Sequence, residues 1–292
     1  MRGNPEAHEL VAMNSLPEVL AQLGSAPGTW MPIAGGTELM VAHAAGRLTT
    51  PRLISVWGLP ELAFIRVSDD SISIGGGVTF GQIRRNAAIA AGFPLLTLAA
   101  SWIGSIANQN RATLAGNIVN GSPAADAPPA LLVYDAEIEL ISQRGSRRLP
   151  YAQFHLGYKQ SVLEPDELVL ALHLPRRFAK HKQYLRKVGT RKAMAITKVA
   201  LAGAAIVNDG KLSEIRLAAA SVADRPVRMI ATEETLLGKE LTPETKRSAR
   251  NALLGEVRPI DDIRSTAEYR KHVAANLLDE FLDELMRGEV SA

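Results

Sequence analysis

The stretch TWMPIAGGTELMVAHAAG, residues 29–46, determines the local fold of the N-terminal part of the chain. Residues 29–34 are typical of a strand, the glycine pair forms a turn, and a helix capped by Thr37 is expected to follow through Ala45. Glycines let the backbone approach a ligand closely, and the first amides of a helix attract an anion such as a phosphate. The turn lacks the G-x-G-x-x-G fingerprint of dinucleotide-binding folds. A phosphate cradle and a plain strand-to-helix turn both fit this stretch.

A second stretch, residues 108–129, is rich in Asn, Gly, Ser and Pro and shows little periodicity of apolar residues. This composition predicts an extended, structured loop, and loops of such length inside a domain are usually functional. Thr113, Asn117 and Asp126 could offer a ligand a hydroxyl, an amide and a carboxylate. The alternative is a loop whose Asn side chains hydrogen-bond their own backbone.

Hydrophobic periodicity around these two stretches predicts further helices and strands up to Pro175, which is expected to end both a strand and a domain. The last two strands before Pro175 alternate like members of an antiparallel sheet. The expected elements are a helix at 14–24, a strand at 71–74 that ends in the glycines 75–77, a helix opened by Thr79, a helix-like apolar run at 93–106, and strands at 136–142 and 167–174.

The residues after Pro175 predict a compact second domain. Residues 176–192 hold eight Lys or Arg and no acidic residue, so they could attract an anionic ligand or an acidic partner, or form a solvated linker. The turn Asn208-Asp209-Gly210 between two apolar runs is a strong signal for a hairpin. Its strands are expected at 195–207 and 211–222, and helices at 229–237, 243–254 and 267–286.

The composition excludes several classes of protein. The chain has 292 residues and a net charge of +3, which is too balanced to indicate nucleic acid as the main partner. It has no cysteine, which excludes disulfides, a thiolate nucleophile and an iron–sulfur cluster held by this chain. Its six histidines form no HxxxH or HExxH pair, so we expect no metal site. Residues 199–207, the longest apolar run, fall far short of the roughly 20 residues of a membrane span, and no signal peptide is visible, so the cytoplasm is the expected location.

Two motifs, taken in their order and spacing, resemble those of a known family. AGGTEL at residues 34–39, and TLAGN followed by SPAAD within residues 113–126, are similar to hallmarks of the FAD-binding subunit of the xanthine dehydrogenase and carbon monoxide dehydrogenase family, the molybdenum hydroxylases. Residues 107–132, 186–192 and 267–270 resemble the same family. The resemblance therefore extends over nearly the whole chain.

The resemblance implies an α/β and α+β protein. It would begin with a two-lobed, PCMH-like FAD-binding domain over residues 1–175, with lobes at about 1–56 and 57–175. A smaller C-terminal domain over residues 176–292 would combine an antiparallel sheet with a helical bundle. The division at Pro175 is the one that the local patterns predict as well.

The resemblance also implies a set of FAD contacts. The glycine turn and its flanks would wrap the pyrophosphate, and the Thr113 segment would line the other side of the cofactor. Asp126 would bond a ribose or adenosine hydroxyl, while Lys187 would bond a carbonyl of the isoalloxazine. Ile103 and Gly104 would face the flavin end. The full expected set is Pro32, Ile33, Ala34, Gly35, Gly36, Thr37, Glu38, Leu39, Ile103, Gly104, Thr113, Ala115, Gly116, Asn117, Asp126, Val169 and Lys187.

Two positions depart from the family pattern. Ala115 stands where relatives usually have Gly, a change that costs little if the φ of Ala115 is negative. Gln109 stands where many relatives have Arg, which puts in doubt a contact at the edge of the flavin or of a partner surface. FAD binding itself is not put in doubt.

The function implied is that of an oxidoreductase subunit that passes electrons from iron–sulfur clusters through FAD to an acceptor such as NAD or oxygen. Such a relay needs no side-chain base, and the sequence offers no catalytic triad. Because the chain has no cysteine, we expect the clusters and the molybdopterin on partner chains, an iron–sulfur subunit and a molybdopterin-binding large subunit. Two alternatives stay open: a stand-alone flavin oxidoreductase with a base such as His155 or Tyr158, and a cofactor-free scaffold subunit of the complex.

Overall fold

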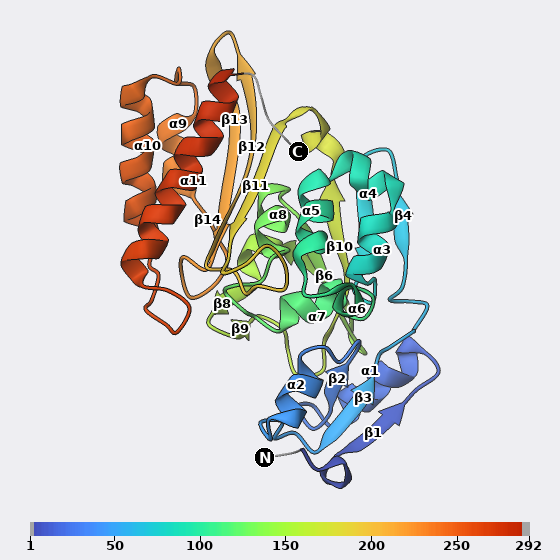
Figure 1. Ribbon diagram of the computed structural model, residues 1–292. Helices are drawn as coiled ribbons and strands as arrows, with labels where there is room; N and C mark the ends of the chain where they lie inside the picture. The colour runs from blue at the N-terminus through green and yellow to red at the C-terminus, as the bar shows by residue number, and fades with distance from the viewer. Residues whose placement is uncertain (1–2, 288–292) are drawn as a thin grey trace.

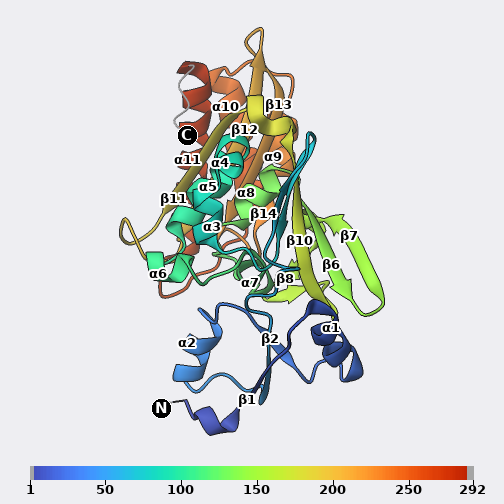
Figure 2. The ribbon, with the colours of Figure 1, turned by 90° about the vertical axis from the view of Figure 1, so that its right-hand side faces the viewer.

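The computed structural model describes residues 3–287, so the outermost residues of the two expected domains lie outside the described part. The molecule is elongated, with an N-terminal lobe at one end and a middle lobe next to it (Figure 1). The C-terminal domain lies beside the middle lobe and away from the N-terminal lobe (Figure 2). No helix within residues 3–287 has both the length and the apolar character needed to cross a membrane.

The N-terminal lobe is a small parallel sheet with strand order β1-β3-β2. Parallel strands need a crossover connection, and the helices α1 and α2 supply it. Ser15 caps α1 by accepting a hydrogen bond from the Glu18 amide, and Val19 and Leu23 of that helix share a buried core with Ile54 of the sheet. The elements are η1 (Pro5–Ala7), β1 (Glu9–Ala12), α1 (Leu16–Ser25), β2 (Met31–Ile33), α2 (Leu39–Ala44) and β3 (Arg52–Ser55).

The middle lobe is built on a five-stranded antiparallel sheet with strand order β4-β5-β10-β6-β7. Successive side chains of a strand point to opposite faces, so Ile72 and Ile74 of β5 enter the same core as Leu172 of β10. The strand β10 ends at Pro175, as the sequence predicts. The elements are β4 (Ile65–Val67), β5 (Ser71–Gly75), β6 (Glu137–Ser142), β7 (Gly145–Pro150), η2 (Tyr151–Gln153) and β10 (Leu168–Pro175), with a separate ribbon of β8 (His155–Gly157) and β9 (Gln160–Ser161).

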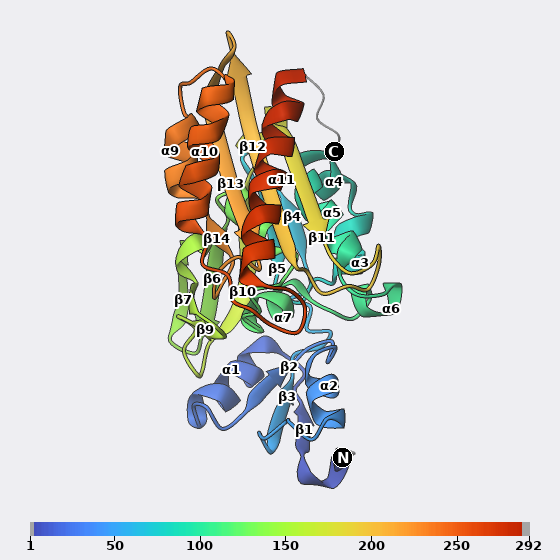
Figure 3. The same ribbon diagram turned by 60° about the vertical axis from the view of Figure 1, so that its left-hand side comes forward.

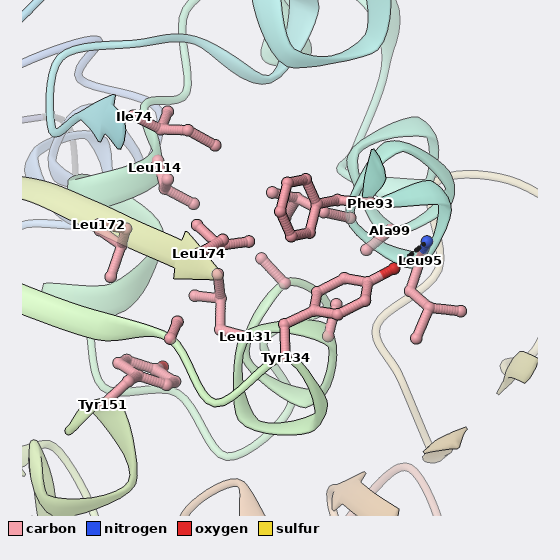
Figure 4. Packing of buried hydrophobic residues seen from close by; sticks show 14 of the residues in the cluster. Ile74, Phe93, Leu95, Ala99, Leu114, Leu131, Tyr134, Tyr151, Leu172 and Leu174 are labelled. Carbon is pink, nitrogen blue, oxygen red and sulfur yellow. Dashed lines mark hydrogen bonds between the residues drawn. The ribbon is translucent and has the colours of Figure 1, made fainter. Parts of the chain in front are cut away.

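Short helices pack on this sheet and complete the core of the middle lobe (Figure 4). Phe93 meets Tyr134 edge to face, with ring centroids 5.0 Å apart. The hydroxyl of Tyr134 accepts a hydrogen bond of 3.0 Å from the amide of Leu95, which satisfies a polar group inside the core. The helices are α3 (Phe80–Arg85), α4 (Ala87–Gly92), α5 (Pro94–Trp102), α6 (Ile106–Gln109), α7 (Leu114–Val119) and α8 (Pro128–Val133).

The C-terminal domain is an antiparallel sheet, order β11-β12-β13-β14, whose outer face is covered by a helical layer (Figure 3). The predicted hairpin turn is present, with positive φ at Asp209 and Gly210. The inner face of the sheet joins the core of the middle lobe through Leu185, Ala202 and Ala218. The elements are η3 (Arg176–Lys180), β11 (Lys182–Val188), β12 (Val199–Asn208), β13 (Lys211–Ala220), β14 (Val227–Arg228), α9 (Ile230–Leu236), α10 (Pro243–Glu256) and α11 (Ala267–Arg287).

The prediction of an extended loop over residues 108–129 is wrong, because α7 and the start of α8 lie in this stretch. Thr113 caps α7 with its side chain, as Ser105 caps α6 just before. Helices of four to six residues are too short to show an apolar period, and local caps rather than an amphipathic face define their ends.

Two smaller predictions also fail. α2 begins at Leu39 rather than after a cap on Thr37, and Glu38, which precedes it, makes no side-chain cap hydrogen bond. Gly36 has a left-handed backbone, with a φ of +73°, so the tight turn continues past it and the helix starts later than a cap at Thr37 would imply. The basic residues 176–192 are not a solvated linker, since β11 lies within them and pairs with β12.

The loop between α10 and α11 is organised by the carboxylate of Asp262. It accepts hydrogen bonds from the amide of Arg264 at 2.8 Å, from the guanidinium of Arg264 at 2.6 Å and from Arg270 at 2.7 Å. Burial alone would raise the pKa of Asp262, but the hydrogen bonds from Arg264 and the charges of both arginines hold that pKa at about 2.

We expect Asp262→Asn to lower the free energy of unfolding by about 2 kcal/mol at pH 6. The folded pKa of Asp262 lies below its unfolded value, so the stability that the carboxylate contributes is present above about pH 4 and is lost as the pH falls toward about 2. Urea unfolding of parent and variant should therefore differ less and less over that range. A difference that does not change with pH would contradict this role.

Candidate functional site

The backbone of the glycine turn offers unpaired hydrogen-bond donors. The amides from Gly35 to Leu39 donate no hydrogen bond to any other residue in the described part of the chain. Gly36 adopts the left-handed conformation that this tight turn needs. A row of free amides just before a helix is a backbone arrangement that binds phosphate groups.

Gly35 lies directly against the backbone of Arg111, just before the TLAGN motif. A Cβ on Gly35 would stand 1.7 Å from the carbonyl oxygen of Arg111, so only glycine fits here. In return, Nε of Arg111 donates to the Gly35 carbonyl at 3.1 Å. The same guanidinium stacks on Trp57, with Cζ 4.5 Å from the ring centroid. Two segments 76 positions apart in sequence thus meet where the N-terminal lobe adjoins α7 (Figure 1).

The first turn of α7 uses its amides within the protein. The amide of Gly116 donates to the Thr113 hydroxyl at 3.1 Å, and the amide of Ala115 donates to the Gly76 carbonyl at 3.1 Å. Asn117 differs, because its buried Oδ1 has no hydrogen-bond partner among the described residues. A buried polar atom without a partner is costly, so this oxygen is suited to accept a hydrogen bond from a ligand.

Gly76 brings two of the expected site residues together. A Cβ on Gly76 would stand 2.3 Å from the carbonyl oxygen of Val169 and 3.0 Å from the Cβ of Ala115. Ala115 lies within α7 and is not among the residues with positive φ. Alanine in place of the glycine that relatives usually have therefore brings no backbone strain.

Asp126 and Lys187 form a buried ion pair between the middle lobe and β11. Nζ of Lys187 lies 2.7 Å from Oδ2 of Asp126, and each side chain is only 10% exposed. Thr197 donates its hydroxyl to the other carboxylate oxygen. Burial raises the pKa of Asp126, and the charge and hydrogen bond of Lys187, together with the bond from Thr197, oppose that rise. Both partners therefore favour the ionised carboxylate.

This ion pair bears on the roles that the resemblance implies for Asp126 and Lys187. The two side chains bond each other, so a ligand group that reaches one of them lies close to the other. The separate contacts expected with a ribose or adenosine hydroxyl and with an isoalloxazine carbonyl stay predictions.

Ile103 and Gly104 lie between α5 and α6. Gly104 has a φ of +46°, and a Cβ there would stand 2.9 Å from the side chain of Asn108, so local packing alone requires glycine. Ile103 is half-buried against the core of the middle lobe. The contact of these two residues with the flavin end stays a prediction.

The side chain of Gln109 makes hydrogen bonds inside the middle lobe rather than a contact at the surface. This side chain is buried, Nε2 donates to the Ser101 carbonyl at 2.9 Å, and Oε1 accepts a hydrogen bond from Arg84. It therefore links α3, α5 and α6.

Neither a metal-binding cluster nor an accessible base is found, among the described residues, at the positions that the sequence left open. Within residues 3–287, no group of three or more His, Cys, Asp or Glu side chains is placed to hold a metal ion. His155 is buried, with Nε2 2.9 Å from the Tyr151 hydroxyl, and burial together with the charge of Arg225 lowers its pKa to about 4. Tyr158 is 62% exposed. At neutral pH His155 is an uncharged, enclosed group rather than an accessible base.

Four further positions of this region belong to no motif that the sequence patterns single out, namely Trp57, Gly76, Arg111 and Thr197. The glycine run 75–77 was a visible signal for Gly76, since glycine at a strand end often marks a close backbone approach. Arg111 adjoins the TLAGN motif. Thr197 carries no signal, because only folding brings it to Asp126, 71 positions away.

Comparison with known proteins identifies the family. Residues 6–177 match the model of the FAD binding domain in molybdopterin dehydrogenase. The chain belongs to the FAD-binding subunits of the molybdenum hydroxylase family. Residues 184–285 of this flavoprotein match the CO dehydrogenase flavoprotein C-terminal domain, which agrees with the antiparallel sheet and helices described above.

Individual relatives support the assignment. The flavoprotein is 31% identical to the xanthine dehydrogenase FAD-binding subunit of Escherichia coli O157:H7, over 86% of this chain and 87% of that one. It is 28% identical to the carbon monoxide dehydrogenase medium chain of Hydrogenophaga pseudoflava, over 96% and 97% of the two chains. The solved carbon monoxide dehydrogenase from that organism superposes with a TM-score of 0.90, at 28% identity, over 95% of this chain and 96% of the solved one. Quinoline 2-oxidoreductase from Pseudomonas putida 86, at 23% identity, shows the same fold with a TM-score of 0.90 over the whole of both chains.

The residues of this flavoprotein fit the FAD that its family binds. The free amides of the glycine turn suit a pyrophosphate, and the unpaired oxygen of Asn117 suits a hydroxyl or an N–H of the cofactor. Both lie on segments that Gly35 and Arg111 hold together. FAD is the cofactor of this subunit.

We expect Arg111→Gln to weaken FAD binding about 3- to 10-fold, because the Gly35 carbonyl and the Trp57 ring lose a charged partner. Titration of the flavin-free chain with FAD, followed by quenching of flavin fluorescence, measures the effect. Arg66→Gln is the matched control, since the Arg66 guanidinium also stacks on a ring, that of Phe64, at 4.3 Å. Equal affinities of the two variants would contradict a role for Arg111 at the site.

Proposed function

We propose that this subunit relays electrons within a larger complex, from iron–sulfur clusters on a partner subunit to an acceptor such as NAD or oxygen. Bound FAD supplies the chemistry, since a flavin can take electrons singly from a cluster and deliver a pair to an acceptor. The protein binds and orients the cofactor. The observation that carries the proposal is the row of free amides from Gly35 to Leu39, held beside Arg111 and the motif that contains Asn117.

We assign the seventeen expected residues to the cofactor as follows. The glycine turn and its flanks hold the pyrophosphate, where backbone donors are free. The α7 segment lines the other side, with Asn117 as the hydrogen-bond acceptor. Asp126 and Lys187 together form one polar contact, and Val169 shapes the wall behind Ala115. Ile103 and Gly104 are assigned to the flavin end on the family resemblance alone.

The proposed partners are an iron–sulfur subunit and a molybdopterin-binding large subunit. Two relatives are named as a medium chain and as an FAD-binding subunit, names that describe parts of multi-subunit enzymes. Clusters are held by cysteine thiolates, and this chain has no cysteine. The electron source of the relay is therefore assigned to another chain.

The proposed acceptor is anionic, and NAD is the first candidate. Arg191 and Lys192 are exposed in the loop that follows β11, a few residues from Lys187. Positive charge near the flavin raises the local concentration of an anionic acceptor. Oxygen, which is uncharged, would gain nothing from these residues, so the salt dependence of acceptor reduction distinguishes the two.

Isolation of the native complex through a tag on this chain tests the proposal. We expect two further chains, with iron and molybdenum in the complex and flavin on the tagged chain after the subunits are separated. Recovery of the tagged chain alone, with turnover of a small substrate by that chain, would support a stand-alone oxidoreductase instead. The enclosed, neutral His155 does not favour that alternative.

A further inference from the structure

Arg270 is a buried arginine outside the segments that the family resemblance assigns to FAD. Only 3% of it is exposed, although it lies in the first turn of α11, where a positive charge opposes the helix dipole. Its NH2 donates to Oδ1 of Asp262 at 2.7 Å. Its NH1 donates to the carbonyls of Lys198 at 2.9 Å and Ser221 at 3.2 Å. A charge buried at an unfavourable helix position and bonded to two loops indicates a positioning role.

The two carbonyls that Arg270 holds stand at the open end of the long hairpin. Lys198 precedes β12 and Ser221 follows β13. Ser221 has a φ of +63°, and its hydroxyl donates to the Thr197 carbonyl at 2.9 Å. Its amide donates to the carbonyl of Pro123 at 2.8 Å. Arg270 therefore fixes the residue that follows Thr197 and also Ser221, whose hydroxyl bonds the Thr197 carbonyl.

Thr197 connects these backbone contacts to Asp126, which is assigned to the cofactor site. Its hydroxyl donates to one carboxylate oxygen of Asp126, while Lys187 donates to the other. An unbroken series of hydrogen bonds thus leads from Asp262 through Arg270, Ser221 and Thr197 to Asp126. Asp126 receives its two partners from the two ends of the loop between β11 and β12, and Arg270 holds the end that carries Thr197.

We propose that Arg270 is a positioning residue for the FAD site. Through its bonds to the carbonyls of Lys198 and Ser221, Arg270 keeps the Thr197 hydroxyl on Asp126. The proposal rests on the assignment of Asp126 to that site. Arg270 acts only through Thr197, so its contribution to FAD affinity disappears when the Thr197 hydroxyl is absent.

A double-mutant cycle on the full chain tests this dependence. Flavin-free Arg270→Gln, Thr197→Val and the double variant are titrated with FAD, beside Asp126→Asn. We expect each of the two single changes to raise the dissociation constant about 10-fold, and the double variant to bind no more weakly than either. Arg250→Gln is the matched control, because it removes an arginine bonded to Asp279 and Asn276 in the same helical layer, and it should bind FAD as the parent does.

The outcomes separate the positioning role from general stability and from the site assignment. If the losses of Arg270→Gln and Thr197→Val multiply, or if Arg270→Gln binds as tightly as Arg250→Gln, the proposal is overturned. Should Arg270→Gln fold too poorly to titrate, Asp262→Ala removes the oxygen that anchors the far side of the guanidinium, and parental FAD affinity of that variant overturns the proposal equally. Unchanged binding by Asp126→Asn would instead overturn the site assignment on which the proposal rests.

Discussion

Gly35→Ala is expected to weaken FAD binding at least about 100-fold. The added Cβ would stand 1.7 Å from the carbonyl oxygen of Arg111, and backbone atoms cannot yield as a flexible side chain can. The N-terminal lobe must move away from the segment before α7. That movement separates the free amides of the glycine turn from Asn117.

Equilibrium titration with FAD, and the flavin content of the purified chain, measure this loss. Gly255→Ala is the control, because a Cβ there meets nothing within 4 Å and lies in α10, where alanine favours the helix. The control should bind FAD as the parent does. If Gly35→Ala retained FAD with parental affinity, the two motifs would not form one site.

Lys187→Met is expected to lower the free energy of unfolding of the flavin-free chain by about 3 kcal/mol, because it breaks a buried ion pair. Asp126, without its partner and with a pKa already raised by burial, then takes up a proton at a higher pH than in the parent. The double variant Asp126→Asn, Lys187→Met should regain at least half of the loss, since no uncompensated charge stays buried.

Urea unfolding of the flavin-free chain measures these differences. Arg52→Met is the matched control, because it breaks an ion pair with Glu9 at 3.2 Å whose side chains are about half exposed. Exposed pairs contribute about 1 kcal/mol or less, so the control should change little. A loss in Lys187→Met no larger than that of Arg52→Met would show that the pair does not stabilise the junction between the middle lobe and β11.

Much of the fold follows from local patterns in the sequence. The hairpin at Asn208-Asp209-Gly210 is specified by residues that tolerate positive φ, and both Asp209 and Gly210 adopt it. The long helix α11 shows its apolar period over 21 residues. α6 and α7 span four and six residues and show no such period, so the prediction of a loop was wrong there.

The candidate site was also predictable only in part. Here the cause was not the shortness of the helices but the long-range contacts that complete the site. The glycine turn and the TLAGN motif are local, so both are visible in the sequence. The contacts that join them are not, because Arg111 reaches Gly35 and Thr197 reaches Asp126 only after three separate parts of the chain have packed together. Long-range geometry of this kind follows from the packing of separate hydrophobic clusters against one another, not from any short pattern.

The central claim is that this chain itself holds the flavin while the metals lie on its partners. Titration of the flavin-free full chain with FAD, combined with iron and molybdenum analysis of the same sample, tests it most directly. We expect tight binding of a single FAD per chain and neither metal. Failure to take up FAD, or iron or molybdenum bound to the isolated chain, would contradict the claim.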